Sequence, residues 1–122
     1  MRKAVLCAAV VALAIQANFA AAQPGYPIKP IRWVVPFPPG GSVDTLARTV
    51  SARLAENLGQ QVIVDNRSGA SGAIGSELVS RAAPDGHTLL SNTVPFVANT
   101  FLYKQVPYVV LVDFAPISLM AM

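Results

Sequence analysis

The sequence has 122 residues, of which 53% are hydrophobic and 12% are charged, with a net charge of +3. Its basic residues are scattered, with no run and no interleaved aromatic residues, so composition excludes the usual footprint of a nucleic-acid-binding protein. One cysteine and one histidine are too few for a disulfide or for a metal site built on thiolates or imidazoles.

The N-terminal residues have the pattern of a secretory signal peptide. Arg2 and Lys3 give a positive start, an apolar stretch covers residues 4–15, and small residues follow. We predict cleavage after Ala22 and export to the periplasm, because the apolar stretch is too short for a retained membrane span. Residues 23–122 would then keep seven Lys/Arg against six Asp/Glu, a net charge of +1, and no cysteine nucleophile.

Strands and helices are expected to alternate along residues 23–122. Short β-branched and aromatic runs predict the strands, and apolar residues at the spacing of one helical face predict the helices. In chain order we predict a strand at Ile31–Pro36, a helix at Ser42–Leu58, a strand at Val62–Asp65, a helix with its inner face at Ile74, Leu78 and Ala82, a strand at Thr88–Ser91, a short helix at Asn99–Gln105 and a fourth strand at Phe114–Met122. This order predicts an α/β fold of βαβ units on a parallel sheet.

A glycine-rich turn joins the first predicted strand to the first helix. Pro38 and Pro39 stiffen this turn, whereas glycines lack a Cβ atom and let backbone N–H groups approach a bound molecule. The helix begins directly after the turn, and its unpaired N–H groups and dipole favour an anion. We therefore predict ligand contacts at Pro39, Gly40, Gly41, Ser42 and Val43.

A second glycine loop follows the second predicted strand. Its spacing, G-x-x-G-x-x-G at residues 69–75, is not a dinucleotide fingerprint, and the sequence has no G-x-x-x-x-G-K-[ST] phosphate loop. Both loops follow neighbouring parallel strands, so two helix N-termini should meet at one sheet edge, where a small carboxylate fits best. We predict further ligand contacts at Gly69, Ala70, Ser71, Gly72, Ala73 and Ile74, and at Ser91 and Thr93 after the third strand.

Several of these residues also have a purely structural interpretation. A Gly-Gly turn before a helix can be simple turn chemistry, and Ser71 can be a helix N-cap as well as a ligand contact. Asp44 could complement the helix dipole or orient the first loop, and we favour a structural role. Arg67 could pair with a ligand, but a solvated surface charge is the favoured interpretation.

The order of these motifs resembles the Bug family, the substrate-binding proteins of tripartite tricarboxylate transporters. The resemblance rests on Y-P-I-K-P at 26–30, V-V-P-F-P-P-G-G at 34–41, the segment 58–77, A-P-D-G at 83–86 and D-F-A-P at 113–116. It implies an exported type II periplasmic-binding fold, which clamps a small carboxylate between two domains and hands it to a membrane permease. The two glycine loops would supply ligand contacts, and no catalytic residue, cofactor or metal is implied.

Family members are considerably longer, so the resemblance implies that residues 23–122 are the N-terminal part of an incomplete first domain, with the second domain absent. The alternative is a truncated, non-functional fragment. An exported hydrolase is less favoured, because there is no G-x-S-x-G elbow and no identified nucleophile beside His87. We also expect unpaired edges at the third and fourth strands, which would leave this chain partly unfolded, aggregated or dependent on a partner, with weak or no carboxylate binding.

Overall fold

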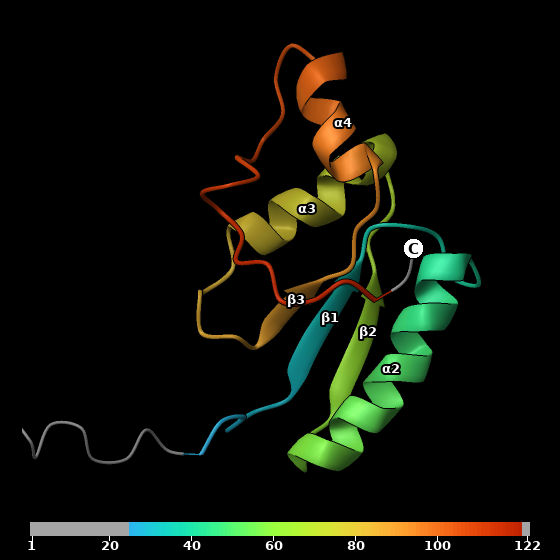
Figure 1. Cartoon of the computed structure of the whole chain (residues 1–122), viewed down its shortest axis with the longest axis vertical. Coiled ribbons are helices and arrows are strands. Elements are labelled where there is room, and N and C mark those ends of the chain that lie inside the picture. Colours follow the sequence, from blue (N-terminus) through green and yellow to red (C-terminus); the bar gives the residue numbers. More distant parts are fainter. Residues whose placement is uncertain (1–24, 121–122) are drawn as a thin grey trace, which may run out of the picture.

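The structure is a computed structural model that describes residues 25–120. The predicted signal peptide, with its cleavage after Ala22, lies outside these residues. The described elements are β1 (Ile31–Val35), α2 (Ser42–Leu58), β2 (Val62–Asn66), the single 3-10 turn η2 (Ala70–Gly72), α3 (Ala73–Ser80), β3 (Thr88–Leu90) and α4 (Pro95–Leu102) (Figure 1). Helix and strand alternate as predicted as far as α4.

The three strands form one parallel sheet in the order β2-β1-β3. Trp33 in β1 is in register with Val64 of β2 and with Leu89 of β3, so β1 is the central strand. Helix α2 covers one face of the sheet and α3 the other (Figure 1). The predicted α/β fold with a parallel sheet is confirmed.

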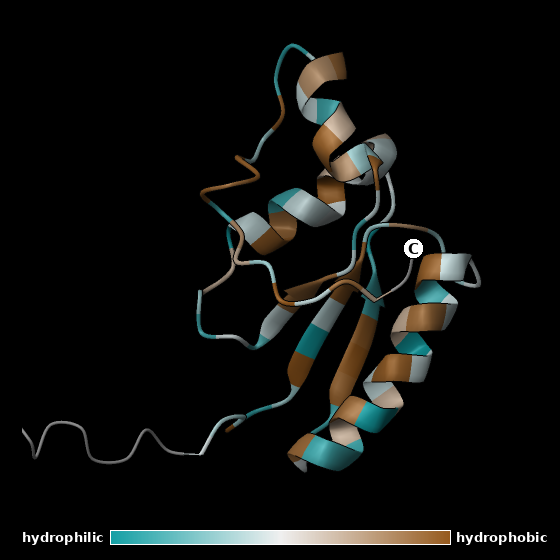
Figure 2. Cartoon of the chain, in the orientation of Figure 1, coloured by the Kyte–Doolittle hydropathy of each residue, from teal (hydrophilic) through white to brown (hydrophobic). Residues whose placement is uncertain are grey.

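The hydrophobic core lies between β1 and α2. Trp33 and Val35 of β1 and Ala47 of α2 are buried there, surrounded by half-buried apolar side chains of α2 and β2. Figure 2 shows hydrophobic and hydrophilic residues alternating along α2, as expected for a helix with one face on a sheet. The helix ends at Leu58 and is capped by Gly59, whose φ of 65° is left-handed and whose N–H donates to the Ala55 carbonyl.

The inner face predicted for α3 is partly wrong. Ile74 is 51% exposed, and the buried residues of α3 are Gly75 and Ser76. A Cβ atom on Gly75 would lie 2.7 Å from Cβ of Pro36, so the absent side chain lets α3 approach the end of β1. The spacing of apolar residues did not predict this buried face, because α3 contacts the end of β1 through its backbone at Gly75 rather than through a large side chain.

The C-terminal part also differs from the prediction. Helix α4 spans Pro95–Leu102 rather than Asn99–Gln105, and its proline lies in the first turn, where no intrahelical N–H bond is lost. No strand forms over residues 114–120, and Ala121 and Met122 lie outside the described residues. A strand needs a hydrogen-bonded neighbour, and among the described residues none pairs with this segment.

An aromatic cluster anchors the chain after α4. The rings of Phe96 and Tyr108 stack with centroids 5.1 Å apart, and Phe114 packs edge-on against both. The Tyr108 hydroxyl donates a hydrogen bond of 2.9 Å to the Phe96 carbonyl. Side-chain packing therefore positions this irregular segment. No helix in the described part of the chain is both long enough and apolar enough to cross a membrane.

Candidate functional site

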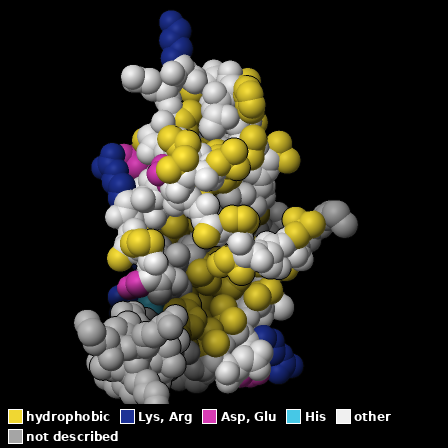
Figure 3. All heavy atoms as spheres, turned by 60° about the vertical axis from the view of Figure 1, so that its left-hand side comes forward, with side chains coloured by type: hydrophobic (Ala, Val, Ile, Leu, Met, Phe, Trp, Pro, Cys, Tyr) yellow, Lys and Arg dark blue, Asp and Glu magenta, His cyan; other side chains and the backbone are white. Residues whose placement is uncertain are grey.

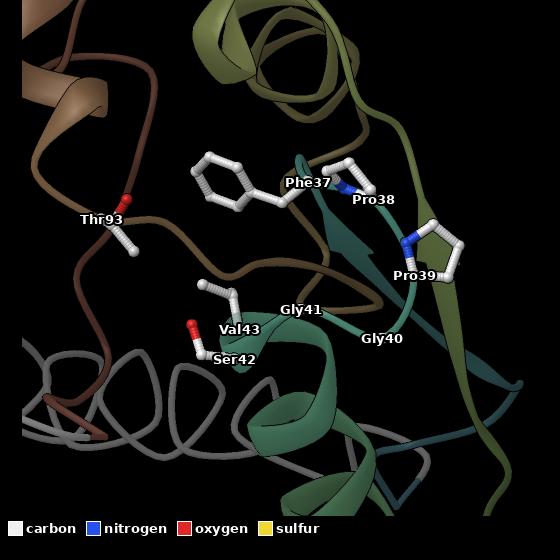
Figure 4. Close-up of a pocket in the computed structure, with 8 residues that line it drawn as sticks. All are labelled: Phe37, Pro38, Pro39, Gly40, Gly41, Ser42, Val43 and Thr93. Carbon is white, nitrogen blue, oxygen red and sulfur yellow. The ribbon is translucent and has the colours of Figure 1, made fainter.

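A surface depression, the larger of the two described here, lies at the carboxyl end of β1. It has a volume of about 570 Å3 and is lined by Phe37, Pro38, Pro39, Gly40, Gly41, Ser42, Val43 and Thr93. Figure 4 shows the first glycine loop leading into α2 on one side, and Thr93 facing it from the segment between β3 and α4. All five residues predicted in the first loop therefore line one depression, together with Thr93.

The N-terminus of α2 supplies hydrogen-bond donors to this region. Its first helical hydrogen bond runs from the Thr45 N–H to the Gly41 carbonyl, at 2.9 Å. The N–H groups of residues 41–44 have no acceptor among the described residues, and Gly41, the N-cap, offers no side-chain cap. These amides and the positive end of the helix dipole are suited to an anion.

The two glycines of this loop have different backbone conformations and different roles. Gly40 has a φ of +81°, a left-handed conformation that a side chain strains, and its N–H donates to the Asp44 carboxylate at 2.9 Å. Gly41 is extended, with φ −73° and ψ 169°, and a Cβ atom there would lie 3.4 Å from the Pro38 carbonyl oxygen. The left-handed turn thus requires Gly40, and the Gly40 N–H is already occupied.

Asp44 connects the loop to the helix and to the sheet. Its buried carboxylate accepts hydrogen bonds from the Gly40 N–H, the Arg48 guanidinium and the Asn66 amide, each at 2.9 Å. The Asn66 amide also donates to the Phe37 carbonyl at 3.1 Å. The Arg48 hydrogen bond, followed by those from Gly40 and Asn66, lowers the pKa of Asp44 to about 2. Asp44 therefore stays ionised, and the structure shows it orienting the loop.

The second glycine loop has a run of left-handed residues. Gly69, Ala70, Ser71 and Gly72 all have positive φ, and the Gly72 N–H closes the turn on the Gly69 carbonyl at 3.0 Å. The N-cap of α3 is Gly72, without a side-chain capping bond, so the predicted capping role of Ser71 is wrong. The left-handed backbone moves Ser71 out of the cap position. Its carbonyl accepts a hydrogen bond of 3.1 Å from Asn99 of α4.

The two loops are adjacent but line different depressions. A Cβ atom on Gly72 would lie 3.4 Å from Cβ of Pro36 and 3.7 Å from Cζ of Phe37, which places the second loop against the first. A smaller depression, of about 220 Å3, contains Ala70, Ala73 and Ile74 together with residues of α4 and the segment after it. Gly69, Ser71, Gly72 and Ser91 line neither of these two depressions.

Ser91 was predicted to contact ligand, and the structure gives it another role. It is 1% exposed, and its hydroxyl accepts a hydrogen bond of 2.7 Å from the indole N–H of Trp33. The sequence prediction did not include Phe37 and Pro38, which line the larger depression, or Asn66, which hydrogen-bonds to the loop and to Asp44. The first two belong to the same glycine loop, and Asn66 is a polar residue at the carboxyl end of a strand, a signal that could have identified it.

Two further residues lie away from the larger depression. Arg67 is half-exposed and pairs with Asp65 at 3.0 Å, in keeping with the favoured surface role. His87 is buried directly before β3, at the opposite end of the strand from Thr93. The described residues contain no group of three or more His, Cys, Asp or Glu side chains that could hold a metal ion.

The sequence is similar to a known receptor family. The family model described as "Tripartite tricarboxylate transporter family receptor" matches residues 46–122. A UPF0065 protein from the tcbD-tcbE intergenic region of Pseudomonas sp. strain P51 is 47% identical over 98% of this chain and 36% of its own length. Protein BugT of Bordetella pertussis is 46% identical over 77% of this chain and 29% of its own length. The chain spans about a third of the length of these relatives.

Solved structures agree with these sequence comparisons. A periplasmic transporter is 48% identical, with a TM-score of 0.64 over 68% of this chain and 28% of that chain. An R. palustris protein solved with adipate is 40% identical, with a TM-score of 0.63 over 68% of this chain and 28% of that chain. MatC from Rhodopseudomonas palustris, with bound malate, is 45% identical, with a TM-score of 0.52 over 53% of this chain and 22% of that chain.

Proposed function

The chain belongs to the tripartite tricarboxylate transporter receptor family, and from this premise we propose that it forms one wall of the binding site for a small carboxylate in a periplasmic solute-binding protein. The observation that carries the proposal is the depression over the N-terminus of α2, where the N–H groups of residues 41–44 have no acceptor among the described residues. Adipate and malate are bound by two proteins of similar structure.

The chemistry of the depression suits a carboxylate with a short carbon chain. A hydrogen bond from a backbone N–H to a charged oxygen contributes about 1.5–3 kcal/mol, so two such bonds would fix one carboxylate group. Phe37 and Val43 provide apolar surface beside these donors for the carbon chain. The ion pair of Asp44 with Arg48 offsets the carboxylate charge of Asp44, which lies close to the donors.

The wider biological role follows from the family and is part of the proposal. We infer that a signal peptide at residues 1–22 directs the protein to the periplasm, and that the membrane permease of a tripartite tricarboxylate transporter receives the carboxylate. The protein acts by binding rather than by catalysis. Support comes from the family match and from the periplasmic proteins among its structural neighbours.

Titration of the ¹⁵N-labelled chain with adipate and with malate, followed by amide NMR, tests the proposal. Because this chain would form one wall of the site, we expect weak binding, with shifts at the amides of residues 41–44 that saturate only at high carboxylate concentration. Amides in the last turns of α2 should stay unchanged. The uncharged control is 1,6-hexanediol, which matches the length of adipate and should give no such shifts. A folded chain whose amides at residues 41–44 do not respond to either carboxylate would contradict the proposal.

A further inference from the structure

We propose that Asp44, Arg48 and Asn66 form a clamp that fixes the loop at residues 37–41 before any ligand binds, so that they are positioning residues of the carboxylate site. The ligand part of this inference rests on the proposed function. The part that concerns the order of the loop does not, because it is a property of the chain without ligand.

The three side chains bond to one another in a closed ring. Arg48 donates to Asp44 at 2.9 Å and to the Asn66 side-chain oxygen at 3.1 Å, and the Asn66 amide donates to Asp44 at 2.9 Å. One member belongs to the first turn of α2, one to the next turn and one to the end of β2. Each side chain is therefore held by the other two, and the ring joins the helix to the sheet.

The ring forms hydrogen bonds with two backbone groups of the loop. Asp44 accepts the Gly40 N–H at 2.9 Å, and Asn66 donates to the Phe37 carbonyl at 3.1 Å. Between these points lie Pro38 and Pro39, which have no N–H and a fixed φ. Gly40, which has the left-handed φ of +81°, is thus the residue whose N–H is fixed by the ring.

The hydrogen bonds of the ring do not use the N–H donors at the N-terminus of α2. In a capping box, the acidic residue at the third helical position reaches back to the N–H of the N-cap residue. Asp44 holds that position but bonds to Gly40, one residue before the N-cap Gly41. The clamp therefore uses an N–H outside the helix, and the N–H groups of residues 41–44 keep no acceptor among the described residues.

The test measures amide hydrogen exchange in the chain without ligand and then adipate binding. In Asp44→Ala and in Arg48→Gln, exchange at Gly40, whose N–H is bonded to Asp44, should rise by at least about tenfold, the effect of losing one restraining hydrogen bond. Asp44→Asn, which keeps an acceptor oxygen, should restore part of the protection. Exchange in the last turns of α2 should not change. Arg53→Gln is the matched control, because Arg53 lies on the same helix and its partner within residues 25–120 is the exposed Glu56.

The outcomes separate the clamp from the proposed function. Parent-like exchange at Gly40 in Arg48→Gln, a half-exposed position that folding should tolerate, overturns the clamp even if Asp44→Ala fails to fold. Faster exchange with unchanged adipate affinity also overturns it as a positioning device. Faster exchange with at least about fivefold weaker adipate binding supports it. A parent chain that binds no adipate contradicts the proposed function, and the exchange data still decide whether the loop is clamped.

Discussion

Asn66, the last residue of β2, donates a hydrogen bond of 2.9 Å to the carboxylate of Asp44 in the first turn of α2. The two residues are separated by 22 positions in the sequence and meet because β2 returns parallel to β1, beside the loop that opens the helix. This contact makes the geometry of the first glycine loop depend on the sheet.

The two glycines of the first loop should respond differently to substitution. Gly40→Val forces a β-branched residue into a left-handed conformation, which costs about 1–2 kcal/mol or more. Gly41→Val avoids that cost, because φ is −73°, but it brings a side chain to the Pro38 carbonyl and narrows the approach to the free amides. Urea unfolding followed by Trp33 fluorescence should show the larger loss of stability for Gly40→Val. Equal losses would mean that the loop relaxes around Gly40.

Gly41→Val should mainly affect ligand binding. The added side chain lies at the N-cap of α2, next to the donors proposed to bind the carboxylate. We expect weaker adipate binding, bounded by the loss of one or two charge-assisted hydrogen bonds at about 1.5–3 kcal/mol each. Calorimetric titration of parent and variant measures the difference. Unchanged affinity would show that this glycine only shapes the turn.

Gly75→Ala should destabilise the fold although alanine is the better helix former. The new Cβ atom would lie 2.7 Å from Cβ of Pro36 and 2.9 Å from the Arg67 carbonyl oxygen, so α3 or the loop must move. Overpacking of this kind costs about 1–3 kcal/mol, against a propensity gain of about 1 kcal/mol. Gly25→Ala is the control, because no atom lies within 4 Å of its Cβ position. A stabilised Gly75→Ala variant would contradict the close packing of α3 on β1.

Ser91→Ala should leave the indole N–H of Trp33 buried without an acceptor. Trp33 is 5% exposed, and loss of a buried partner costs about 1–3 kcal/mol. The urea midpoint should fall and the near-UV circular dichroism of the only tryptophan should change. Ser118→Ala, at an exposed serine, is the matched control and should leave both unchanged. A parent-like Ser91→Ala variant would mean that the indole finds another acceptor.

Stability should fall in acid because several carboxylates, among them Asp44 and Asp85, have depressed pKa values in the folded chain. Hydrogen bonds from Arg48, Gly40 and Asn66 lower the pKa of Asp44 from 3.8 to about 2, and those from Lys29 and the His87 N–H lower the pKa of Asp85 to about 2. The unfolded chain therefore binds protons first as the pH falls. The stabilisation from these carboxylates is complete above about pH 5 and is lost between about pH 4 and pH 2.

The urea midpoint measured against pH checks this expectation. Asp44→Asn and Asp85→Asn should each flatten the acid part of the profile, and the double variant should have the flattest profile. If both single variants retain the slope of the parent chain, the loss of stability in acid has another origin.

The exposed apolar surface should make the isolated chain of residues 23–122 prone to self-association or partial unfolding. Phe101 is 83% exposed and Leu111 is 92% exposed, and Figure 3 shows hydrophobic side chains over much of the face that it presents. Surfaces of this kind favour aggregation. Light scattering during size-exclusion chromatography should detect oligomers, and Phe101→Lys with Leu111→Lys should reduce them. Gln61→Lys with Gln105→Lys, at two exposed polar residues, controls for the two added charges. A monomeric parent with a sharp cooperative melt would refute the expectation.

Local signals in the sequence determined the first half of the fold. Helix α2 was predicted at Ser42–Leu58 with its observed bounds, because the glycines at 41 and 59 and the apolar spacing between them act within one segment. The β-branched runs and the alternation of strand and helix predicted a parallel sheet. The rule that parallel strands deliver their following loops to one sheet edge predicted that the two glycine loops lie side by side, although they line different depressions.

The tertiary structure decided what depends on distant partners. Ser71 does not cap α3 because the loop is left-handed and held by Asn99, and Ser91 is buried because it accepts the Trp33 N–H. Residues 114–120 form no strand because no described strand pairs with them. The ring of Asp44, Arg48 and Asn66 exists only when β2 lies beside β1. Local periodicity cannot encode such contacts, since each depends on where the backbone places two segments that are far apart in the sequence.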